Sequence, residues 1–479
     1  MGMNPREALR PDLCILGASA AGGALAVAAA AQGLSVALIA KEPAADRIAS
    51  VVPGAVFRAV GEAAQRPTQL LGASRPSPVS DPADFARAQA HIAKVADALA
   101  PKYAQARLEA MKVTVLKPPG RFIRPDAVET AGRIVKARRF VIAPGLQRRP
   151  LSIRGLDLIR PLTAADLRRL ERPPERLIIV GADPQGLEIA QAMRRLGGEV
   201  ALLSETRIFA DEDDEIVAPL RVQFLREGVV LREDAKILRV EPDGAGLRVL
   251  IAAAGAASEV EAFAGSHLFL ASGAAPALEG LGLAAAGVRF DASGVKVDAN
   301  LRSSNRRIYA IGAAGGDAES EAYRVLRHMR TFPFGFFAKR SAPPRTRVAW
   351  TSPQIAFTGL TEDAARKRRR PICVSRFPFS CADRAQIDGA TAGHVKLVMT
   401  RGGKILGAAM VGPAAGELIN LYALSISQGM YASDLASIPV PYPSFAEAAL
   451  GAALAFEARP APATWRIFRL ARLITQAIQ

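Results

Sequence analysis

Two glycine-rich turns have the residue types and spacing best suited to chemistry with a nucleotide. One spans Gly17–Gly22 (GASAAG) and the other Gly181–Gly186 (GADPQG). A turn of this kind between a buried strand and a helix presents backbone N–H groups at the helix N-terminus, where they can bind the pyrophosphate of a dinucleotide. Two such turns support this prediction more than one, because a single match has a high false-positive rate. The glycines could instead serve close packing alone, and both interpretations stay open.

Each turn lies within a predicted strand–turn–helix–strand unit. An apolar run that stops at the first glycine predicts a buried strand, and an apolar stretch of helical length follows the turn. A second strand then completes the unit, as in a dinucleotide-binding domain. The first unit comprises a strand over 12–16, a helix ending near Gln32-Gly33 and a strand over 35–40; the second comprises 177–180, 187–196 and 199–203.

Three further apolar runs predict buried strands that end in a glycine, namely Phe140–Gly145, Leu268–Gly273 and Ile308–Gly312. A segment rich in Pro and Arg, Ser341–Arg345, indicates a domain boundary. Beyond it we expect strands over 394–399 and 405–411 and a helix over about 414–429. The predicted fold class is α/β, with two Rossmann-like domains followed by a C-terminal α+β domain.

Composition excludes several classes of function. The chain has 479 residues, half of them apolar, and a formal charge of +17. The basic residues are mostly scattered arginines and only 6% of residues are aromatic, which argues against a nucleic-acid partner. No apolar run is long enough to cross a bilayer, and the first residues do not form a secretory signal, so we expect a cytoplasmic protein. The run 366–370 (RKRRR) is expected to form a surface loop.

Cysteine and histidine are too few and too scattered for a metal site or a disulfide framework. The three cysteines are Cys14, Cys373 and Cys381, and none belongs to a CxxC pair. The four histidines lie far apart in the sequence, so no metal is predicted. We expect Cys373 and Cys381 to lie on or beside strands and to pack as small apolar residues.

The order of these features resembles the pyridine nucleotide-disulfide oxidoreductase family, especially its dihydrolipoamide dehydrogenase and mercuric reductase branch. The resemblance implies an FAD-binding domain, an inserted NAD(P)-binding domain and a C-terminal domain through which two subunits form a homodimer with shared active sites. It covers nearly the whole chain. The segments that carry it are Ala271–Pro276, Ile308–Gly312, Ser352–Gln354, Gly359–Glu362 and Pro441–Glu447.

The resemblance divides the chain at specific boundaries and assigns residues to each cofactor. The FAD-binding domain is expected over 1–160 and 281–345, the NAD(P)-binding domain over 161–280, the dimerisation domain over 346–455 and a basic tail over 456–479. The residues implied at the flavin are Gly17, Ser19, Gly22, Lys41, Gly145, Gly312 and Ala313. Those implied for nucleotide binding in the inserted domain are Gly181, Gly186, Glu188, Arg207 and Gly273, with the choice between NAD and NADP left open.

Several positions depart from the family pattern around the nucleotides. Ala40 replaces the acid that would bind the adenosine ribose of FAD, and Ala313 replaces an aspartate near the flavin's ribityl and phosphate groups. Asp183 takes the place of the middle glycine in the second turn. Its carboxylate would repel a pyrophosphate by about 1 kcal/mol at 4 Å in water and by several when partly buried. We therefore expect weakened binding of a nicotinamide nucleotide.

The redox disulfide of the family is missing from its expected place. The segment that follows the disulfide aligns with Val52–Ala55, which puts Asp46 and Val51 at the two cysteine positions and Ala55 where the family has a lysine. A dithiol relay needs one thiolate to attack and a second sulfur to resolve the intermediate. The sequence therefore predicts that electrons leave the flavin without a dithiol relay.

Near the C-terminus the family's acid–base pair aligns with Tyr442 and Glu447, which are the candidate catalytic residues. Tyrosine, with an ordinary pKa of about 10, is a poor general base at neutral pH. The mercuric reductase branch also carries tyrosine here. Without the cysteines, both side chains could instead serve the subunit interface.

We expect an FAD-dependent oxidoreductase that passes a hydride from NAD(P)H to FAD and then electrons to a small non-disulfide acceptor such as a quinone or dioxygen. A non-catalytic homodimer of the same fold, with an interaction or membrane-docking role, is the alternative. The tail Thr464–Gln479 has arginines every third residue between apolar side chains, which indicates a basic amphipathic helix. It could contact an anionic membrane surface or dock on the dimer.

Overall fold

The structure is a computed structural model that describes residues 8–40, 52–63, 82–117, 120–252, 260–312, 318–331, 343–368 and 371–459. The chain divides into two compact units. Unit 1 comprises Met1–Asp211, Arg221–Ala342 and Ala349–Thr351. Unit 2 comprises Glu212–Leu220, Pro343–Val348 and Ser352–Gln479.

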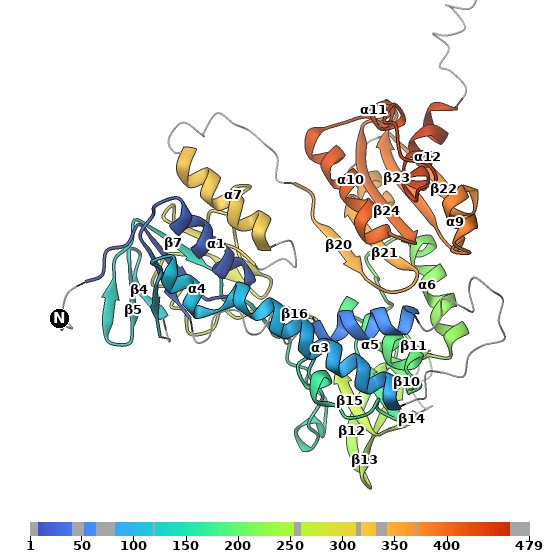
Figure 1. The fold of residues 1–479 in the computed structure, drawn as a ribbon, viewed down its shortest axis with the longest axis horizontal. Coiled ribbons are helices and arrows are strands. Elements are labelled where there is room, and N and C mark those ends of the chain that lie inside the picture. The colour runs from blue at the N-terminus through green and yellow to red at the C-terminus, as the bar shows by residue number, and fades with distance from the viewer. Residues whose placement is uncertain are drawn as a thin grey trace, which may run out of the picture. The chain divides into compact units, whose positions relative to one another are not determined.

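A five-stranded parallel sheet forms the first part of unit 1 (Figure 1). Its central strands are wholly apolar and buried, as expected for a parallel sheet covered on both faces. Helices α1 (Ala20–Ala31) and α7 (Ala318–Thr331) share one apolar core with it. The strand order is β19 (Ile308–Ala310), β7 (Arg139–Ile142), β1 (Leu13–Leu16), β2 (Val36–Ile39) and β3 (Thr114–Leu116).

The opposite face of this sheet packs on a small antiparallel sheet. Phe122 and Val128 of that sheet share a core with Leu16 and Ile142 of the parallel strands.

Residues 52–63 form a helix whose Phe57 ring stacks on Phe85 with centroids 5.0 Å apart. The elements are β4 (Gly120–Arg124), β5 (Ala127–Thr130), β6 (Arg133–Val135), α3 (Pro82–Tyr103) and α4 (Gln105–Ala110). Two short pairs, β8 (Leu146–Arg148) with β16 (Ala274–Pro276) and β17 (Phe290–Asp291) with β18 (Gly294–Val295), complete this part.

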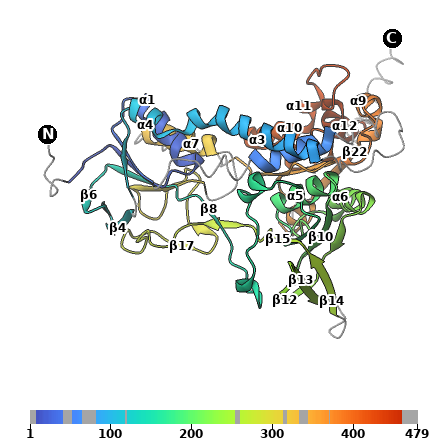
Figure 2. The ribbon, with the colours of Figure 1, turned by 60° about the horizontal axis from the view of Figure 1, so that its bottom comes forward.

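A second parallel sheet repeats the pattern later in unit 1. Its order is β11 (Val230–Arg232), β10 (Glu199–Leu203), β9 (Arg176–Val180) and β15 (His267–Leu270). Helix α5 (Pro184–Arg195) follows β9, and helix α6 (Asp214–Glu227) follows β10. Figure 2 shows the antiparallel strands β12 (Lys236–Asp243), β13 (Gly246–Ala252) and β14 (Val260–Gly265) side by side beyond β15. Two 3-10 turns, η1 (Leu156–Leu158) and η2 (Asp166–Arg169), precede β9.

Unit 2 is a five-stranded sheet with helices packed on it. Its core contains buried residues of β23, β24, α10 and α12, among them Tyr422 and Phe379. The strand order is β20 (Thr346–Ala349), β21 (Gln354–Gly359), β24 (Ile405–Gly412), β23 (His394–Thr400) and β22 (Ile372–Pro378). The helices are α8 (Glu362–Lys367), α9 (Asp383–Ile387), α10 (Ala415–Gln428), α11 (Ala432–Ala436) and α12 (Ala446–Glu457), with the 3-10 turn η4 (Phe379–Cys381).

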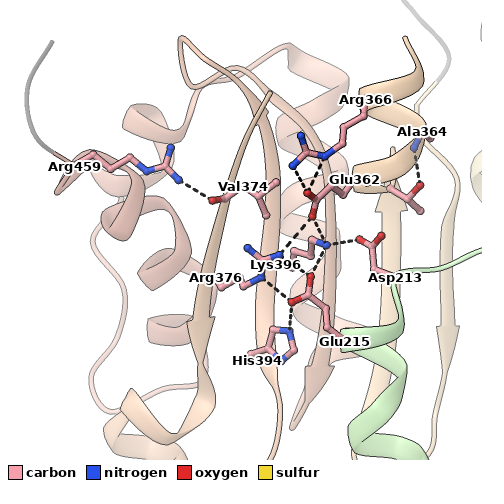
Figure 3. A network of polar contacts seen from close by, with 11 residues as sticks. Asp213, Glu215, Glu362, Ala364, Arg366, Val374, Arg376, His394, Lys396 and Arg459 are labelled. Atoms are coloured by element: carbon pink, nitrogen blue, oxygen red, sulfur yellow. Dashed lines mark hydrogen bonds and ion pairs between the residues drawn. The ribbon is translucent and has the colours of Figure 1, made fainter. Parts of the chain in front are cut away.

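A buried lysine on β23 organises a charge network in unit 2 (Figure 3). The side chain of Lys396 is 2% exposed, and its Nζ lies 2.8 Å from Asp213, 2.5 Å from Glu215 and 2.7 Å from Glu362. Arg376 on β22 adds a second cation, 2.7 Å from Glu215. The bonds from Arg376 and Lys396 lower the pKa of Glu215 to about 2. A buried charge needs such partners, because removing it from water without them is costly.

The predicted fold class is confirmed, and most predicted elements match within a few residues. The helix of the second turn starts at Pro184 rather than at Leu187, because Asp183 caps it and proline is suited to the first helical position. The expected loop at 366–370 is wrong at its start, since Arg366 and Lys367 form the last turn of α8. Their positive charges interact favourably with the negative, C-terminal end of the α8 helix dipole.

The cysteines differ from one another in their surroundings. Cys14 is fully buried on β1, as its apolar neighbours predict, and burial raises the pKa of its thiol. Cys373 is partly buried on β22, while Cys381 is exposed in η4. The expectation that Cys381 packs as an apolar residue is therefore wrong.

Within the described ranges, no helix has the length and apolar character needed to cross a membrane.

Across those same ranges, no group of three or more His, Cys, Asp or Glu side chains could hold a metal ion.

Candidate functional site

The first glycine turn is fixed by packing between β1, α1 and β7. Gly17 has a φ of +104°, and a Cβ there would lie 2.2 Å from the carbonyl oxygen of Ala143. A Cβ on Gly22 would lie 2.2 Å from the carbonyl oxygen of Gly17. Only glycine fits either position, because atoms cannot approach this closely without a shift of the backbone. The two glycines therefore have a structural role whether or not a nucleotide binds.

Ser19, Gly145 and Gly312 come together at the ends of three neighbouring strands, β1, β7 and β19. A Cβ on Gly145 would lie 3.5 Å from Ser19 Cβ, and one on Gly312 would lie 3.6 Å from Ser19 Oγ. Ser19 caps α1, and its Oγ accepts a hydrogen bond from Gly22 N at 3.3 Å. The first turn of α1 contains no acidic residue. A neutral cap and a positive helix end suit the pyrophosphate of FAD.

Glu321 on α7 is a site residue that the sequence analysis missed. It is 9% exposed, and its Oε2 accepts a hydrogen bond from Gly312 N at 2.6 Å. Its position in the first turn of α7 is one where an acid usually interacts with the helix dipole, and the sequence analysis did not predict this helix. Ala40 is buried at the end of β2, and its N–H donates to Leu116 O. Lys41 and Ala313 lie outside the described residues.

The second glycine turn repeats the packing of the first. Gly181 has a φ of +102°, and a Cβ on it would lie 2.1 Å from the carbonyl oxygen of Ala271. A Cβ on Gly186 would lie 2.3 Å from Ala271 Cβ. Ala271 follows β15 as Ala143 follows β7, so both turns pack on the end of the neighbouring strand. The two strand–turn–helix units are built alike.

Asp183 distinguishes the second turn from the first. Its Oδ1 accepts a hydrogen bond from Gly186 N at 2.7 Å, and its Oδ2 accepts one from Gly273 N at 3.1 Å. Burial raises the pKa of this carboxyl, although the two backbone donors and Arg148 act in the opposite direction. The carboxylate therefore uses backbone donors from two separate segments of the chain. The sequence predicted its charge but gave no sign of the bond to Gly273.

Glu188 lies on α5 beside two residues that the sequence analysis did not select. Its Oε1 accepts a hydrogen bond from Trp350 N at 3.0 Å. The guanidinium of Arg58 lies 5.3 Å from the centre of the Trp350 ring and donates to Trp350 O at 3.3 Å. Burial raises the pKa of Glu188, and the charge of Arg58 opposes this. Arg58 follows Ala55 on the same helix, so a cation is present near Glu188 although the family's lysine is not.

Arg207 lies exposed in the turn after β10, close in sequence to the buried Ser204, whose Oγ accepts a hydrogen bond from Thr206 N at 3.3 Å. In a Rossmann domain the end of this strand is where the ribose of the nucleotide is recognised. Glu205 is turned to Ile237, whose N–H donates to Glu205 Oε1 at 3.3 Å. Position 204 carries a serine rather than an acid, and Arg207 is exposed three residues later, so these residues do not select between NAD and NADP.

Tyr442 and Glu447 lie in unit 2, and each has a partner. The hydroxyl of Tyr442 is exposed and donates to Asp383 Oδ2 at 2.7 Å. That bond raises the pKa of Tyr442 above its ordinary value. Glu447 accepts hydrogen bonds from Ser444 N and Asp383 N, both at 3.1 Å. The carboxylate that contacts Tyr442 is therefore that of Asp383. Glu447 holds the backbone at Asp383 and at Ser444.

Comparison with known proteins places the chain within one family. Residues 11–329 match the family described as pyridine nucleotide-disulphide oxidoreductase, and residues 346–453 match the dimerisation domain of that family. The chain is 33% identical to a dihydrolipoyl dehydrogenase of Thermus scotoductus, over 72% of this chain and 76% of the relative. It is 30% identical to a mercuric reductase of Streptomyces lividans, over 93% of this chain and 96% of the relative.

A solved structure has the same fold. The HOCl-induced flavoprotein disulfide reductase RclA of Escherichia coli aligns with a TM-score of 0.75 and 21% identity, over 94% of this chain and 100% of RclA. The family uses FAD together with NAD(P)H. These matches agree with the two nucleotide-type turns and the separate C-terminal sheet, and the chain belongs to the pyridine nucleotide-disulfide oxidoreductase family.

Proposed function

We propose that the protein is an FAD-dependent oxidoreductase that takes a hydride from NAD(P)H and delivers electrons to a small non-disulfide acceptor. The observation that carries the proposal is the neutral cradle formed by Ser19, Gly145 and Gly312 beside the N-terminus of α1. This arrangement suits the pyrophosphate of FAD and contains no carboxylate in the first turn of the helix. The chain is proposed to act as a homodimer, because it carries the family's dimerisation domain.

The flavin is proposed to bind at Gly17, Ser19, Gly22, Gly145 and Gly312, together with Lys41 and Ala313. When bound it would accept a hydride and pass electrons on, which is the chemistry that a flavin supplies. Gly17 and Gly22 shape the turn, and the N–H groups of the α1 N-terminus would face the pyrophosphate. Glu321 orients Gly312 by accepting its N–H.

The nicotinamide nucleotide is proposed to bind at Gly181, Gly186, Glu188, Arg207 and Gly273. Arg58 and Trp350 hold Glu188 in place through the contacts described above. A buried carboxylate fixed by a backbone donor is suited to orient a polar ring by hydrogen bonding. The negative charge of Asp183 would oppose the diphosphate portion of the nucleotide.

The acceptor is proposed to be a quinone, dioxygen or another small molecule. The three cysteines at 14, 373 and 381 contain no closely spaced pair, and Cys14 is fully buried. A dithiol relay needs two sulfurs that can bond to each other, so it is not part of the proposal. With a quinone, one NAD(P)H and one proton would give NAD(P)⁺ and one hydroquinone, which balances two electrons and two protons.

Tyr442 is proposed as a proton donor to the acceptor. Tyr442 carries its proton at neutral pH, because its ordinary pKa is about 10 and Asp383 raises it further, so only the role of proton donor is open to it. Asp383 positions the hydroxyl, and Glu447 positions Asp383. Both carboxylates therefore act through the tyrosine.

A non-catalytic homodimer is the second candidate, and the specific observation in its favour is the double hydrogen bond of Asp183 within the second turn. The visible absorption spectrum of the purified protein separates the candidates, recorded before and after anaerobic addition of NADH or NADPH. Flavin bands that bleach are expected for the oxidoreductase. A well-folded protein that binds no flavin even after incubation with FAD would refute the oxidoreductase.

A further inference from the structure

We propose that Asp183 is a built-in competitor of NAD(P)H, whose carboxylate takes the backbone donors that the nucleotide's diphosphate needs. The nucleotide would bind well only when this side chain is displaced. The proposal deepens the proposed function, because it concerns the same nucleotide turn. It identifies a residue that sets the affinity for the reductant NAD(P)H and that departs from the family's glycine motif at its middle position.

The geometry of the carboxylate carries the first step. Asp183 caps α5, and its Oδ1 accepts the N–H of Gly186 in the first turn of that helix at 2.7 Å. Its Oδ2 accepts the N–H of Gly273 at the end of the neighbouring strand at 3.1 Å. The first-turn N–H groups of a helix after a glycine turn are the donors that bind a diphosphate. One of these first-turn donors, Gly186 N, therefore already has an acceptor in Asp183, and so does Gly273 N at the end of the adjoining strand.

The equivalent position in the first turn provides an internal comparison. Ser19 caps α1 there, and among the described residues its Oγ accepts a hydrogen bond from Gly22 N, at the longer distance of 3.3 Å. Its side chain is neutral, and a Cβ added to the strand-end Gly145 would lie 3.5 Å from Ser19 Cβ. Both turns have the same glycine packing, and they differ in the charge and reach of the cap residue and at the two positions after it, where Pro184 and Gln185 stand in place of Ala20 and Ala21.

Burial disfavours the ionised form of Asp183 and raises its pKa, while the neighbours of the carboxylate partly oppose this. Arg148 on β8 attracts it, and the two backbone donors favour its ionised form. Glu188, one turn along the same helix, repels it. A bound dinucleotide would bring further negative charge to this group, where burial weakens the screening by water. The backbone N–H groups of Gly186 and Gly273 therefore already have a hydrogen-bond acceptor, the carboxyl group of Asp183.

The test replaces Asp183 with the residue found at the same place in the first turn. The D183S holoprotein is titrated with NAD⁺ by calorimetry, since NAD⁺ cannot reduce the flavin. Serine and aspartate cap helices about equally well, so α5 should keep its stability. We expect D183S to bind NAD⁺ at least about tenfold more tightly than the unmodified protein.

Three further variants make the result specific. D183N keeps an oxygen that can accept from Gly186 N, but it has no charge and its amide nitrogen cannot accept from Gly273 N. Its affinity for NAD⁺ should therefore lie between those of the unmodified protein and D183S. D243S removes an exposed carboxylate that pairs with Arg248 elsewhere in unit 1, and should leave NAD⁺ affinity unchanged. S19D places a carboxylate in the first turn, and should lower flavin content.

The outcomes distinguish this proposal from the proposed function. If D183S has a native circular dichroism spectrum but binds NAD⁺ no more tightly than the unmodified protein, the competitor role is refuted. If D183S gains affinity while NADH still fails to bleach the flavin, the competitor role stands and the proposed reductase activity fails. An equal gain in NAD⁺ affinity in D243S would show that the effect comes from net charge alone, and would also refute the proposal.

Discussion

Single residues decide how the two nucleotide turns differ. The glycines of both turns are required by close approach to a neighbouring strand end, so they would persist without any ligand. The cap residues, Ser19 and Asp183, carry the chemical distinction because one is neutral and the other is charged. The same contrast applies at the C-terminal pair, where Asp383 rather than Glu447 contacts Tyr442. At this scale, function depends on which hydrogen-bond partner each polar side chain has.

The affinity for NAD⁺ should rise as the pH falls from neutral to mildly acidic values. Burial raises the pKa of Asp183, so its carboxyl takes up a proton at a higher pH than an exposed aspartate does and loses the charge that opposes the diphosphate. The other charged groups that act on it are Arg148, which stays charged, and Glu188, whose pKa is also raised by burial. Calorimetric titrations over this pH range should show that NAD⁺ affinity depends less steeply on pH in D183S than in the unmodified protein. The same pH dependence in both proteins would contradict the role assigned to Asp183.

Replacing Tyr442 by phenylalanine should lower turnover with a soluble quinone by about tenfold or more, because a proton donor is lost. Reduction of the flavin by NADH in stopped flow should not change. D383N should move the alkaline limb of the pH profile to lower pH, since Asp383 raises the pKa of the tyrosine. A profile that does not move in D383N would leave Asp383 without a role in positioning the proton.

Pairs of elements, rather than isolated ones, build the sites. Each nucleotide turn needs its own strand and helix and also the end of a neighbouring strand, which is β7 for the first turn and β15 for the second. In unit 2, Lys396 joins strand β23 to helix α8 and residues 213–215, and Arg376 joins strand β22 to Glu215 and Glu362. Local sequence fixes each element, while the contacts between elements fix the donors and charges that a site presents.

Two adjacent glycines of α1 should respond in opposite ways to alanine. A Cβ on Gly22 would meet the carbonyl oxygen of Gly17 at 2.2 Å, so G22A should destabilise unit 1 and lower flavin content. A Cβ on Gly23 would meet nothing within 4 Å, so G23A should stabilise the helix by about 0.5–1 kcal/mol. Thermal unfolding and the flavin-to-protein absorbance ratio measure both effects. Equal destabilisation by the two variants would contradict the packing described for this turn.

Replacing Lys396 by methionine should lower the free energy of unfolding by about 3–5 kcal/mol, because three carboxylates lose a buried cation. The pKa of Glu215 is lowered to about 2, so its stabilisation is full above its ordinary pKa of 4.5 and is lost as the pH falls toward 2. Urea unfolding across this window should show a smaller pH dependence in K396M. The exposed pair of Lys296 and Asp291 offers K296M as a control that should change little.

The whole molecule is expected to function as a dimer, since residues 346–453 match the family's dimerisation domain. Unit 2 places an exposed tyrosine with a fixed carboxylate partner at its surface, which is useful only if another protein surface or a substrate meets it. The domain boundaries predicted from the sequence remain predictions at this scale, and the tail from residue 460 onward, like Asp46 and Val51, lies outside the described residues.

Sedimentation equilibrium should give twice the mass of one chain at micromolar concentration, because dimerisation domains of this kind bury large apolar interfaces. Addition of FAD should not change that mass. Chains that remain monomeric under these conditions would contradict the homodimer and would leave Tyr442 without a second subunit to serve.

The sequence by itself determined the two strand–turn–helix units and the charge at position 183, because apolar periodicity and turn chemistry act over a few neighbouring residues. The tertiary structure decided which groups meet. Asp183 meets Gly273, Glu188 meets Trp350, Tyr442 meets Asp383 and Lys396 meets Glu362. These partners lie dozens of residues apart or more, and no local pattern encodes a contact that exists only after distant strands and helices have packed.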